Sequence, residues 1–325
     1  MADRVIVTKD ETKSIMSDLM NIKAVYAPLS NGKKLDYMRV TDVNEVTLDD
    51  ELPYKSPKEL FFPRLEKIIT FKDGEAVAEM PNEQVVLFGA RPCDLEALEI
   101  MKKVFTKGKF KDPYFETRYN NTLLIGIACV GKKPGCFCDE RETDMAYCDK
   151  CDLFLGVNGD GYEVLYASEK GRKELNKYIV IDDFKNRQHD FNPSKTISIE
   201  ASENDMFNRV DWEKKVEICQ GCCMCTYICP TCHCFVFKDM NEGGCAHRYR
   251  NWDSCMFPKF TLHASGHNPR TEKHERYRQR LAHKYLYVRE NFGSVACTGC
   301  GRCVRGCPAG VSIKAVAEGI MEELK

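Results

Sequence analysis

Residues 219–230 read CQGCCMCTYICP, and residues 297–308 read CTGCGRCVRGCP. Both stretches follow the pattern C-x2-C-x2-C-x3-C-P. Gaps of two residues let the chain wrap around one iron–sulfur cubane, so that three thiolates bind three irons. The turn before the proline then carries the fourth cysteine to a neighbouring cluster. The two stretches therefore predict two [4Fe–4S] clusters that exchange their fourth ligands.

This exchange gives each cluster three ligands from one stretch and one from the other. The first cluster is assigned to Cys219, Cys222, Cys225 and Cys307. The second is assigned to Cys297, Cys300, Cys303 and Cys229. Zinc is the alternative, because CxxC pairs also build zinc ribbons. A zinc ribbon needs only two such pairs, however, and leaves the third cysteine and the proline unexplained.

The two stretches are far apart, since 68 positions separate Cys229 from Cys297. Either an insertion has been added to a compact ferredoxin, or helices hold the two stretches together, and we favour the helical architecture. Residues 246–290 carry ten Lys and Arg against four Asp and Glu, with aromatic residues between them. A nucleic-acid surface is the weakest interpretation of this segment. Counter-charge for reduced clusters, or simply a solvated basic helix, is favoured.

Composition limits the class of protein. The chain has 325 residues, 43% of them hydrophobic, and 48 Lys and Arg nearly balance 49 Asp and Glu. Such a chain can bury real cores, and its balanced charge argues against a dedicated binder of nucleic acid or membrane surfaces. Its 19 cysteines are several times what packing requires. They are odd in number, no apolar signal segment precedes them, and no apolar run approaches a membrane span. We expect a soluble, cytoplasmic protein whose reduced thiols bind metal.

The N-terminal part predicts an α/β domain with parallel strands. Residues 85–89 and 123–128 are continuous apolar runs, and a helical face of Leu95, Leu98, Met101 and Phe105 lies between them. Strand, helix and strand in this order indicate a parallel βαβ unit. A polar stretch at 183–210 is interpreted as a linker. The predicted domains are therefore residues 1–205 and a mostly α-helical dicluster domain of residues 206–325, which ends in a helix that begins at Ser312.

Four further cysteines predict a third [4Fe–4S] cluster in the α/β domain. Cys93 follows the first apolar strand, and Cys129, Cys136 and Cys138 follow the second. The carboxyl ends of parallel strands share one edge of the sheet, and the amides at the helix start are expected to favour a Cys93 thiolate.

Other cysteines leave alternatives open. Cys148 and Cys151 form a CxxC pair that competes for this cluster or binds zinc. Free, packed thiols are the simpler interpretation of all these residues. The roles of Cys232, Cys234 and Cys255 also stay open.

Signatures of substrate chemistry are missing from the sequence. No G-x-G-x-x-G follows a strand, no complete phosphate loop occurs, and the seven His include no HExxH. The sequence therefore predicts a chain that carries electrons and is not catalytic alone.

Several motifs together resemble the β subunits of sulfhydrogenases and the related iron–sulfur subunits of anaerobic sulfite reductases. They are YAPL, SPKELFFPRLEKIITF, VLFGARPCDLEAL, DPYFETRYNNTLLIGIAC, GCFC, CPTCHCF, NWDSC and CTGCGRCVRGCPAGVSI. The resemblance implies a non-catalytic iron–sulfur component of a cytoplasmic complex. Its partners would be a flavin- and NAD(P)-binding partner and a catalytic partner, namely a hydrogenase, a sulfite reductase or a heterodisulfide-reductase-type module. Cys148 and Cys151 are not part of the family pattern.

The sequence thus favours an electron-transfer subunit that acts with neither nucleic acid nor a membrane. The alternative is a self-contained iron–sulfur reductase whose flavin or substrate site has no recognisable signature.

Overall fold

A seven-stranded mixed sheet forms the centre of the N-terminal part in this computed structural model, which describes residues 4–48, 51–181, 183–187, 189–193 and 195–325. The strand order is β1-β9-β8-β7-β6-β2-β3. Neighbours from β2 to β8 pair in parallel, and the pairs at both edges are antiparallel. The strands are β1 Ile6–Thr8, β2 Ala24–Ser30, β3 Leu35–Arg39, β6 Val85–Ala90, β7 Thr122–Ile127, β8 Leu153–Asn158 and β9 Gly161–Ala167.

The predicted βαβ unit is confirmed at the centre of this sheet. Strands β6 and β7 pair in parallel, with Val86 opposite Leu123, and the helix α3 (Pro92–Thr106) crosses between them. All six residues of β7 are buried, which explains why the sequence shows an unbroken apolar run. The sheet and α3 therefore fix where the loops at the carboxyl ends of β6 and β7 lie.

Helices and short 3-10 turns flank this sheet. A capping box begins α1, because Thr8 Oγ1 accepts from the Glu11 amide and the Glu11 carboxylate accepts from the Thr8 amide. The elements are α1 Lys9–Met20, η1 Val43–Glu45, α2 Lys58–Phe61, α4 Pro113–Asn120, η2 Asp139–Arg141 and α5 Glu169–Leu175.

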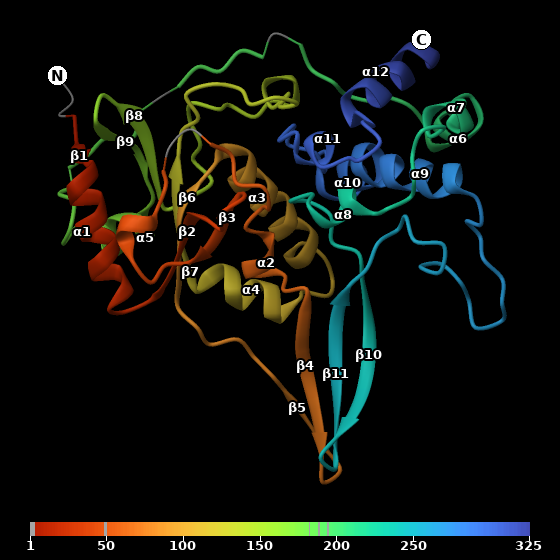
Figure 1. Cartoon of the computed structure of the whole chain (residues 1–325), viewed down its shortest axis with the longest axis horizontal. Coiled ribbons are helices and arrows are strands. Elements are labelled where there is room, and N and C mark those ends of the chain that lie inside the picture. The colour runs from red at the N-terminus through yellow and green to blue at the C-terminus, as the bar shows by residue number, and fades with distance from the viewer. Residues whose placement is uncertain (1–3, 49–50, 182, 188, 194) are drawn as a thin grey trace.

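A second sheet forms an arm that projects from the body (Figure 1). Its order is β10-β11-β4-β5, with β4 Leu65–Lys72, β5 Glu75–Ala78, β10 Phe235–Glu242 and β11 Cys245–Trp252. All pairs are antiparallel, and Arg250 of β11 lies opposite the buried Glu66 of β4 and forms an ion pair with it. Strands from both sides of residue 205 thus share one sheet. The domain division at that residue stays a prediction.

The C-terminal part combines helices with the β10–β11 hairpin. A mostly helical domain was expected, but residues 235–252 form a hairpin: β10 pairs with β11, and β11 pairs with β4. Residues 273–292 are helical, as α9 (Lys273–Ala282), a π-helical segment (His283–Tyr287) and α10 (Val288–Phe292). The remaining helices are α6 Glu203–Asn208, α7 Trp212–Lys215, α8 Met224–Tyr227, α11 Arg302–Arg305 and α12 Ile313–Glu323.

Two further expectations concern single segments. The last helix begins as predicted, because Ser312 caps α12 through the Ala315 amide. The proposed linker at 183–210 includes residues 188 and 194, which lie outside the described residues. Within it, Ile197 and Ile199 are buried in the same core as Trp212 and Tyr285, so this stretch is partly packed.

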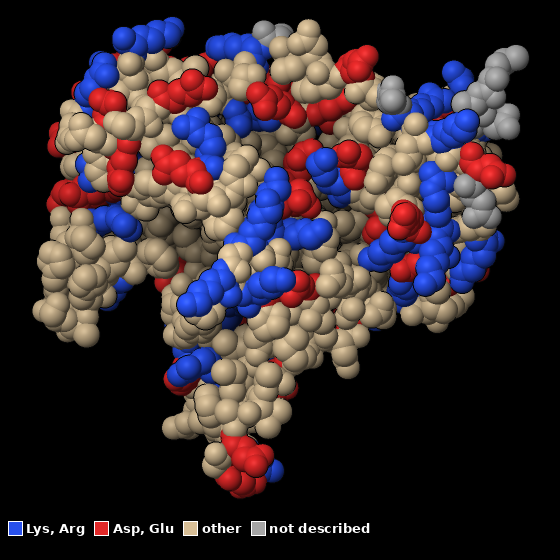
Figure 2. All heavy atoms as spheres, turned by 180° about the vertical axis from the view of Figure 1, so that it is seen from behind, with Lys and Arg blue, Asp and Glu red and all other residues tan. Residues whose placement is uncertain are grey.

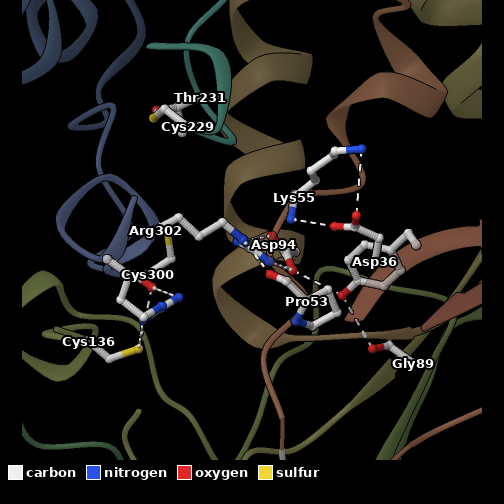
Figure 3. A network of polar contacts seen from close by, with 12 residues as sticks. Asp36, Pro53, Lys55, Gly89, Asp94, Cys136, Cys229, Thr231, Cys300 and Arg302 are labelled. Carbon is white, nitrogen blue, oxygen red and sulfur yellow. Dashed lines mark hydrogen bonds and ion pairs between the residues drawn. The ribbon is translucent and has the colours of Figure 1, made fainter. Parts of the chain in front are cut away.

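A buried ion pair joins the two parts of the chain (Figure 3). Arg302 of α11 donates to both carboxylate oxygens of Asp94 in α3, at 2.6 and 2.8 Å, and Arg302 Nε donates to the Pro53 carbonyl. Tyr37 also donates to Asp94. Both members of the pair are almost fully buried. Neither charge can therefore be solvated if the other is lost.

We expect Asp94→Ala to lower the free energy of unfolding by about 3–5 kcal/mol, because it leaves the Arg302 guanidinium buried and unpaired. Urea unfolding of the cluster-loaded chain measures the loss. The matched control is Asp239→Ala, which breaks an exposed pair with Arg248 and should cost less than about 1 kcal/mol. Equal effects of the two substitutions would contradict a role for the Asp94–Arg302 pair in holding the parts together.

Candidate iron–sulfur centres

The first predicted ligand group surrounds one cavity, here called site A. Cys219, Cys222, Cys225 and Cys307 all line it, together with Tyr277 and Arg280. The Gly221 amide donates to the Cys219 sulfur at 3.4 Å, and the Val311 amide donates to the Cys307 sulfur at 3.3 Å. Amides aimed at sulfur stabilise thiolates. The structure thus places the fourth cysteine of the second stretch beside the first three of the other stretch.

Both cysteine stretches have the same backbone conformation. Gly221 and Gly299 have φ of +66° and +65°, and Cys223 and Gly301 have φ of +64° and +70°. A four-residue helix follows in each case, α8 in the first and α11 in the second. The surplus Cys223 therefore occupies the left-handed position that glycine takes in the second stretch. The two stretches, which have identical cysteine spacing, therefore also present their cysteines on the same backbone turn.

The second ligand group, site B, lies between these two stretches. Burial raises the pKa of the Cys303 thiol, Arg280 lowers it, and the neighbouring Cys300, Cys229 and Cys297 raise it further. Mutual electrostatic influence of this kind requires the four thiols to be close together. Lys284 Nζ donates to the Cys229 sulfur at 3.1 Å. A cluster here would be held by thiolates that face a buried cation.

Three buried cations without carboxylate partners surround sites A and B. Lys58, Arg280 and Lys284 are each 2% exposed. Within the described ranges none of them forms an ion pair with Asp or Glu. They donate to backbone carbonyls and to the Cys229 sulfur, and Arg280 Nε has no partner within those ranges. Buried charges need a compensating charge. The thiolates and sulfides of iron–sulfur clusters would supply that negative charge, so the residues present suit such clusters.

The third predicted ligand group surrounds another cavity, site C. Cys93, Cys129, Cys136 and Cys138 line it, and Cys300 of site B also reaches its wall. Cys93 lies in the first turn of α3, while the other three follow β7. The structure thus brings the four cysteines together at the edge of the sheet, as the sequence predicted. Binding of a cluster by these four residues stays a prediction.

One expectation about site C is wrong. The start of α3 was expected to favour a Cys93 thiolate. Instead, burial raises the pKa of the Cys93 thiol well above its usual value, and the adjacent Asp94 carboxylate raises it further. The helix terminus does not outweigh these two effects. In the absence of iron this thiol is therefore protonated at neutral pH.

Close backbone contact joins site C to site B. The Phe137 amide donates to the Gly299 carbonyl at 2.8 Å, and the Cys136 thiol donates to the Cys300 carbonyl at 3.4 Å. Figure 3 shows Cys136 and Cys300 beside one another. A Cβ atom at position 301 would lie 2.4 Å from the Gly135 carbonyl oxygen, so this contact requires glycine there.

The competing pair Cys148 and Cys151 does not line site C. Both residues are buried in a hydrophobic core with Phe154 and Leu98, and the Cys151 thiol donates to the Cys148 carbonyl. Throughout the part of the chain that the structure describes, no three His, Cys, Asp or Glu side chains are close enough to hold a single metal ion.

The three cysteines whose roles stay open, Cys232, Cys234 and Cys255, each lie against another thiol. The thiols of Cys229 and Cys232 are within hydrogen-bonding contact, as are those of Cys234 and Cys255. Lys58 Nζ donates to the Cys232 carbonyl at 3.0 Å. None of the 19 cysteines forms a disulfide in the structure.

Comparison with known proteins identifies the relatives of the chain. Residues 218–311 match a family model described as a 4Fe-4S dicluster domain. The chain is 30% identical over 321 residues to sulfhydrogenase 2 subunit beta of Pyrococcus furiosus, covering 94% of this chain and 95% of that protein. The chain belongs to the sulfhydrogenase β subunit family. No solved structure matches it.

The dicluster domain of this sulfhydrogenase β subunit family member begins one residue before Cys219 and ends three residues after Pro308. It therefore contains all eight cysteines of sites A and B, and [4Fe–4S] clusters are the cofactors of such a domain. The likeness to the P. furiosus protein extends through the α/β part as well. None of the helices that the structure describes is long and apolar enough to cross a membrane.

Sequence reasoning offered counter-charge as one interpretation of the basic segment 246–290 but did not single out the residues that would provide it. Arg280 and Lys284 of that segment are buried, whereas the buried Arg250 pairs with Glu66 and Asp112. The burial of Arg280 and Lys284 favours counter-charge over a nucleic-acid surface. Figure 2 shows both signs of charge interspersed over the opposite face, with acidic residues at the tip of the arm. The position of Lys58 beside the cysteines could not be predicted from the sequence, because this residue comes from the distant helix α2.

Proposed function

We propose that the protein is the iron–sulfur electron-transfer subunit of a cytoplasmic oxidoreductase complex. It carries electrons between a flavin- and NAD(P)-binding partner and a catalytic partner, such as a hydrogenase, a sulfite reductase or a heterodisulfide-reductase-type module. One observation supports this most strongly: the three cysteine groups adjoin one another in series. Cys303 of site B lines the wall of site A, and Cys300 of site B lines the wall of site C.

Such a series suits a relay. Three [4Fe–4S] clusters at sites A, B and C would each exchange single electrons, and every neighbouring pair would be separated by only one cysteine-bearing loop. The buried cations beside Cys225 and Cys229 would raise the potentials of the nearest clusters by stabilising the added negative charge of reduction. The protein's own residues therefore bind the clusters, exclude water from them and set the charge around them.

The need for partners is supported by two observations. The P. furiosus relative is named as one subunit. The sequence also contains no dinucleotide fingerprint and no carboxylate, His or nucleophile constellation that would carry out substrate chemistry. A flavin- or NAD(P)-binding partner and a catalytic partner would supply what this chain lacks.

We expect the isolated, cluster-loaded chain, free of flavin, to show no turnover with NAD(P)H, hydrogen or sulfite, because its sequence carries no dinucleotide fingerprint and no catalytic constellation. It should nevertheless be reduced by a low-potential donor such as dithionite, seen as bleaching of its iron–sulfur absorbance. Anaerobic stopped-flow absorbance measures both. Oxidation of NAD(P)H by the pure chain after removal of all flavin would contradict the relay and support a self-contained reductase.

A further inference from the structure

A cavity of about 310 Å³ opens between the two parts of the chain, beside sites B and C. One wall is the outer face of α3, and the other is formed by residues 293–298, which lead into the second cysteine stretch. Cys297 of site B lines it, as does Thr143, which also lines site C. Ligand sites commonly occupy such crevices between two packed parts of a protein.

Four basic side chains line this cavity, and one of them, Lys150, pairs with Asp149. Lys103 donates to the Ser294 hydroxyl, Arg289 donates to the Ser198 hydroxyl, and Arg141 donates to the Cys297 and Ile197 carbonyls. Among the residues that the structure describes, none of these three basic residues forms an ion pair with a carboxylate. Their positive charge is thus available to an anionic group within the cavity.

An unpartnered hydroxyl points to the same conclusion. Thr298 is 3% exposed, and its Oγ1 has no hydrogen-bond partner within the described residues. Buried polar atoms in proteins are almost always paired. Because Thr298 lines the cavity, a bound molecule would provide the missing partner.

Acidic residues restrict what that molecule can be. Glu96, Glu99 and Glu142 also line the cavity, so a ligand that is anionic throughout would meet repulsion. A molecule with one anionic end and hydrogen-bond donors at the other would satisfy both kinds of wall. A bare phosphate ion is also much smaller than the cavity.

We propose that this cavity binds a phosphate-bearing organic molecule of about mononucleotide size, with its phosphate held by the basic side chains and the Thr298 hydroxyl. The site goes beyond the relay proposed above, because binding needs no electron transfer. A molecule bound here would lie against the Cys297 segment, where its charge would influence a cluster at site B. The arrangement would couple the occupancy of this cavity to the potential of that cluster.

Titration of the full, cluster-loaded chain with FMN, AMP, riboflavin and inorganic phosphate tests the proposal, with isothermal calorimetry as the readout. We expect FMN or AMP to bind once per chain and riboflavin to bind much more weakly. Arg289→Gln should weaken FMN or AMP binding about tenfold or more through the loss of a charge-assisted hydrogen bond. Thr298→Val should weaken it about fivefold or more through the loss of a hydroxyl donor.

The matched control is Arg209→Gln, which removes an exposed arginine that pairs with Asp205, and it should leave binding unchanged. Iron content is measured in every variant, so that loss of clusters is distinguished from loss of ligand binding. Absence of binding by both FMN and AMP at millimolar concentration would overturn the proposal. So would tight binding of inorganic phosphate alone, binding of riboflavin as tight as that of FMN, or equal binding by the Arg289→Gln and Arg209→Gln variants.

Discussion

Replacement of Cys229 by alanine is expected to remove the cluster of the distant cysteines Cys297, Cys300 and Cys303, while the cluster of its own stretch remains. The reason is the crossed arrangement: Cys307, not Cys229, lines site A with the first stretch, whereas Cys229 belongs to the thiol group around Cys303. The anaerobic protein should lose about four irons per chain. Iron analysis and electron paramagnetic resonance of the reduced protein measure the change.

Two further variants make this result interpretable. Cys223→Ala changes a neighbouring cysteine that is assigned to no cluster, and should leave the iron content unchanged. Cys232 lies in contact with Cys229 and could replace it as a ligand, so the double variant Cys229→Ala/Cys232→Ala is included. If the single variant keeps all its iron and only the double variant loses it, Cys229 is not the ligand. Loss of the site A cluster alone would show that ligation is local within each stretch.

The fold could be predicted where its signals are local. Residues 85–89 and 123–128 are apolar without interruption because both faces of their strands are buried, and the helical period between them marks α3. The arm could not be predicted in the same way. Strand β10 is largely exposed and β11 is half-buried, and β11 is placed by β4, which lies nearly two hundred residues earlier in the chain. Pairing of that kind leaves no periodic trace in either segment.

The candidate sites show the same difference between local and long-range features. Cysteine spacing predicts sites A and B because the ligands are held by short turns whose geometry the sequence determines. The environment of the ligands is set by long-range packing and was foreseen only in part. The basic segment 246–290 indicated counter-charge, but Lys58 comes from α2, and the burial that raises the pKa of Cys93 has no local signal. Local sequence therefore indicated the thiols and a basic segment, but not which basic side chains are buried beside the thiols.

Replacement of Cys93 by alanine is expected to remove about four irons per chain, by abolishing a third [4Fe–4S] cluster at site C. Four thiols, one from the first turn of α3 and three from the loop after β7, line this one cavity, and a cubane has one iron for each of them. Cys136→Ala should give the same loss, although Cys136 lies on the loop that contacts Gly301 and not on α3. Iron analysis of the full chain, reconstituted anaerobically with iron and sulfide, measures both.

The matched control is the pair of variants Cys148→Ala and Cys151→Ala. These cysteines follow the same strand but are buried in the core away from the cavity, so their iron content should equal that of the unaltered chain. Unfolding curves separate loss of a cluster from loss of the fold, because Cys93 is almost fully buried. An iron content of about eight in the unaltered chain would leave only sites A and B occupied. Loss of iron on changing Cys148 or Cys151, but not Cys93, would move the third cluster to the competing pair.

The expected result would extend the relay from the dicluster domain through Cys300 into the α/β part, which would then be the end of the electron path that faces a partner.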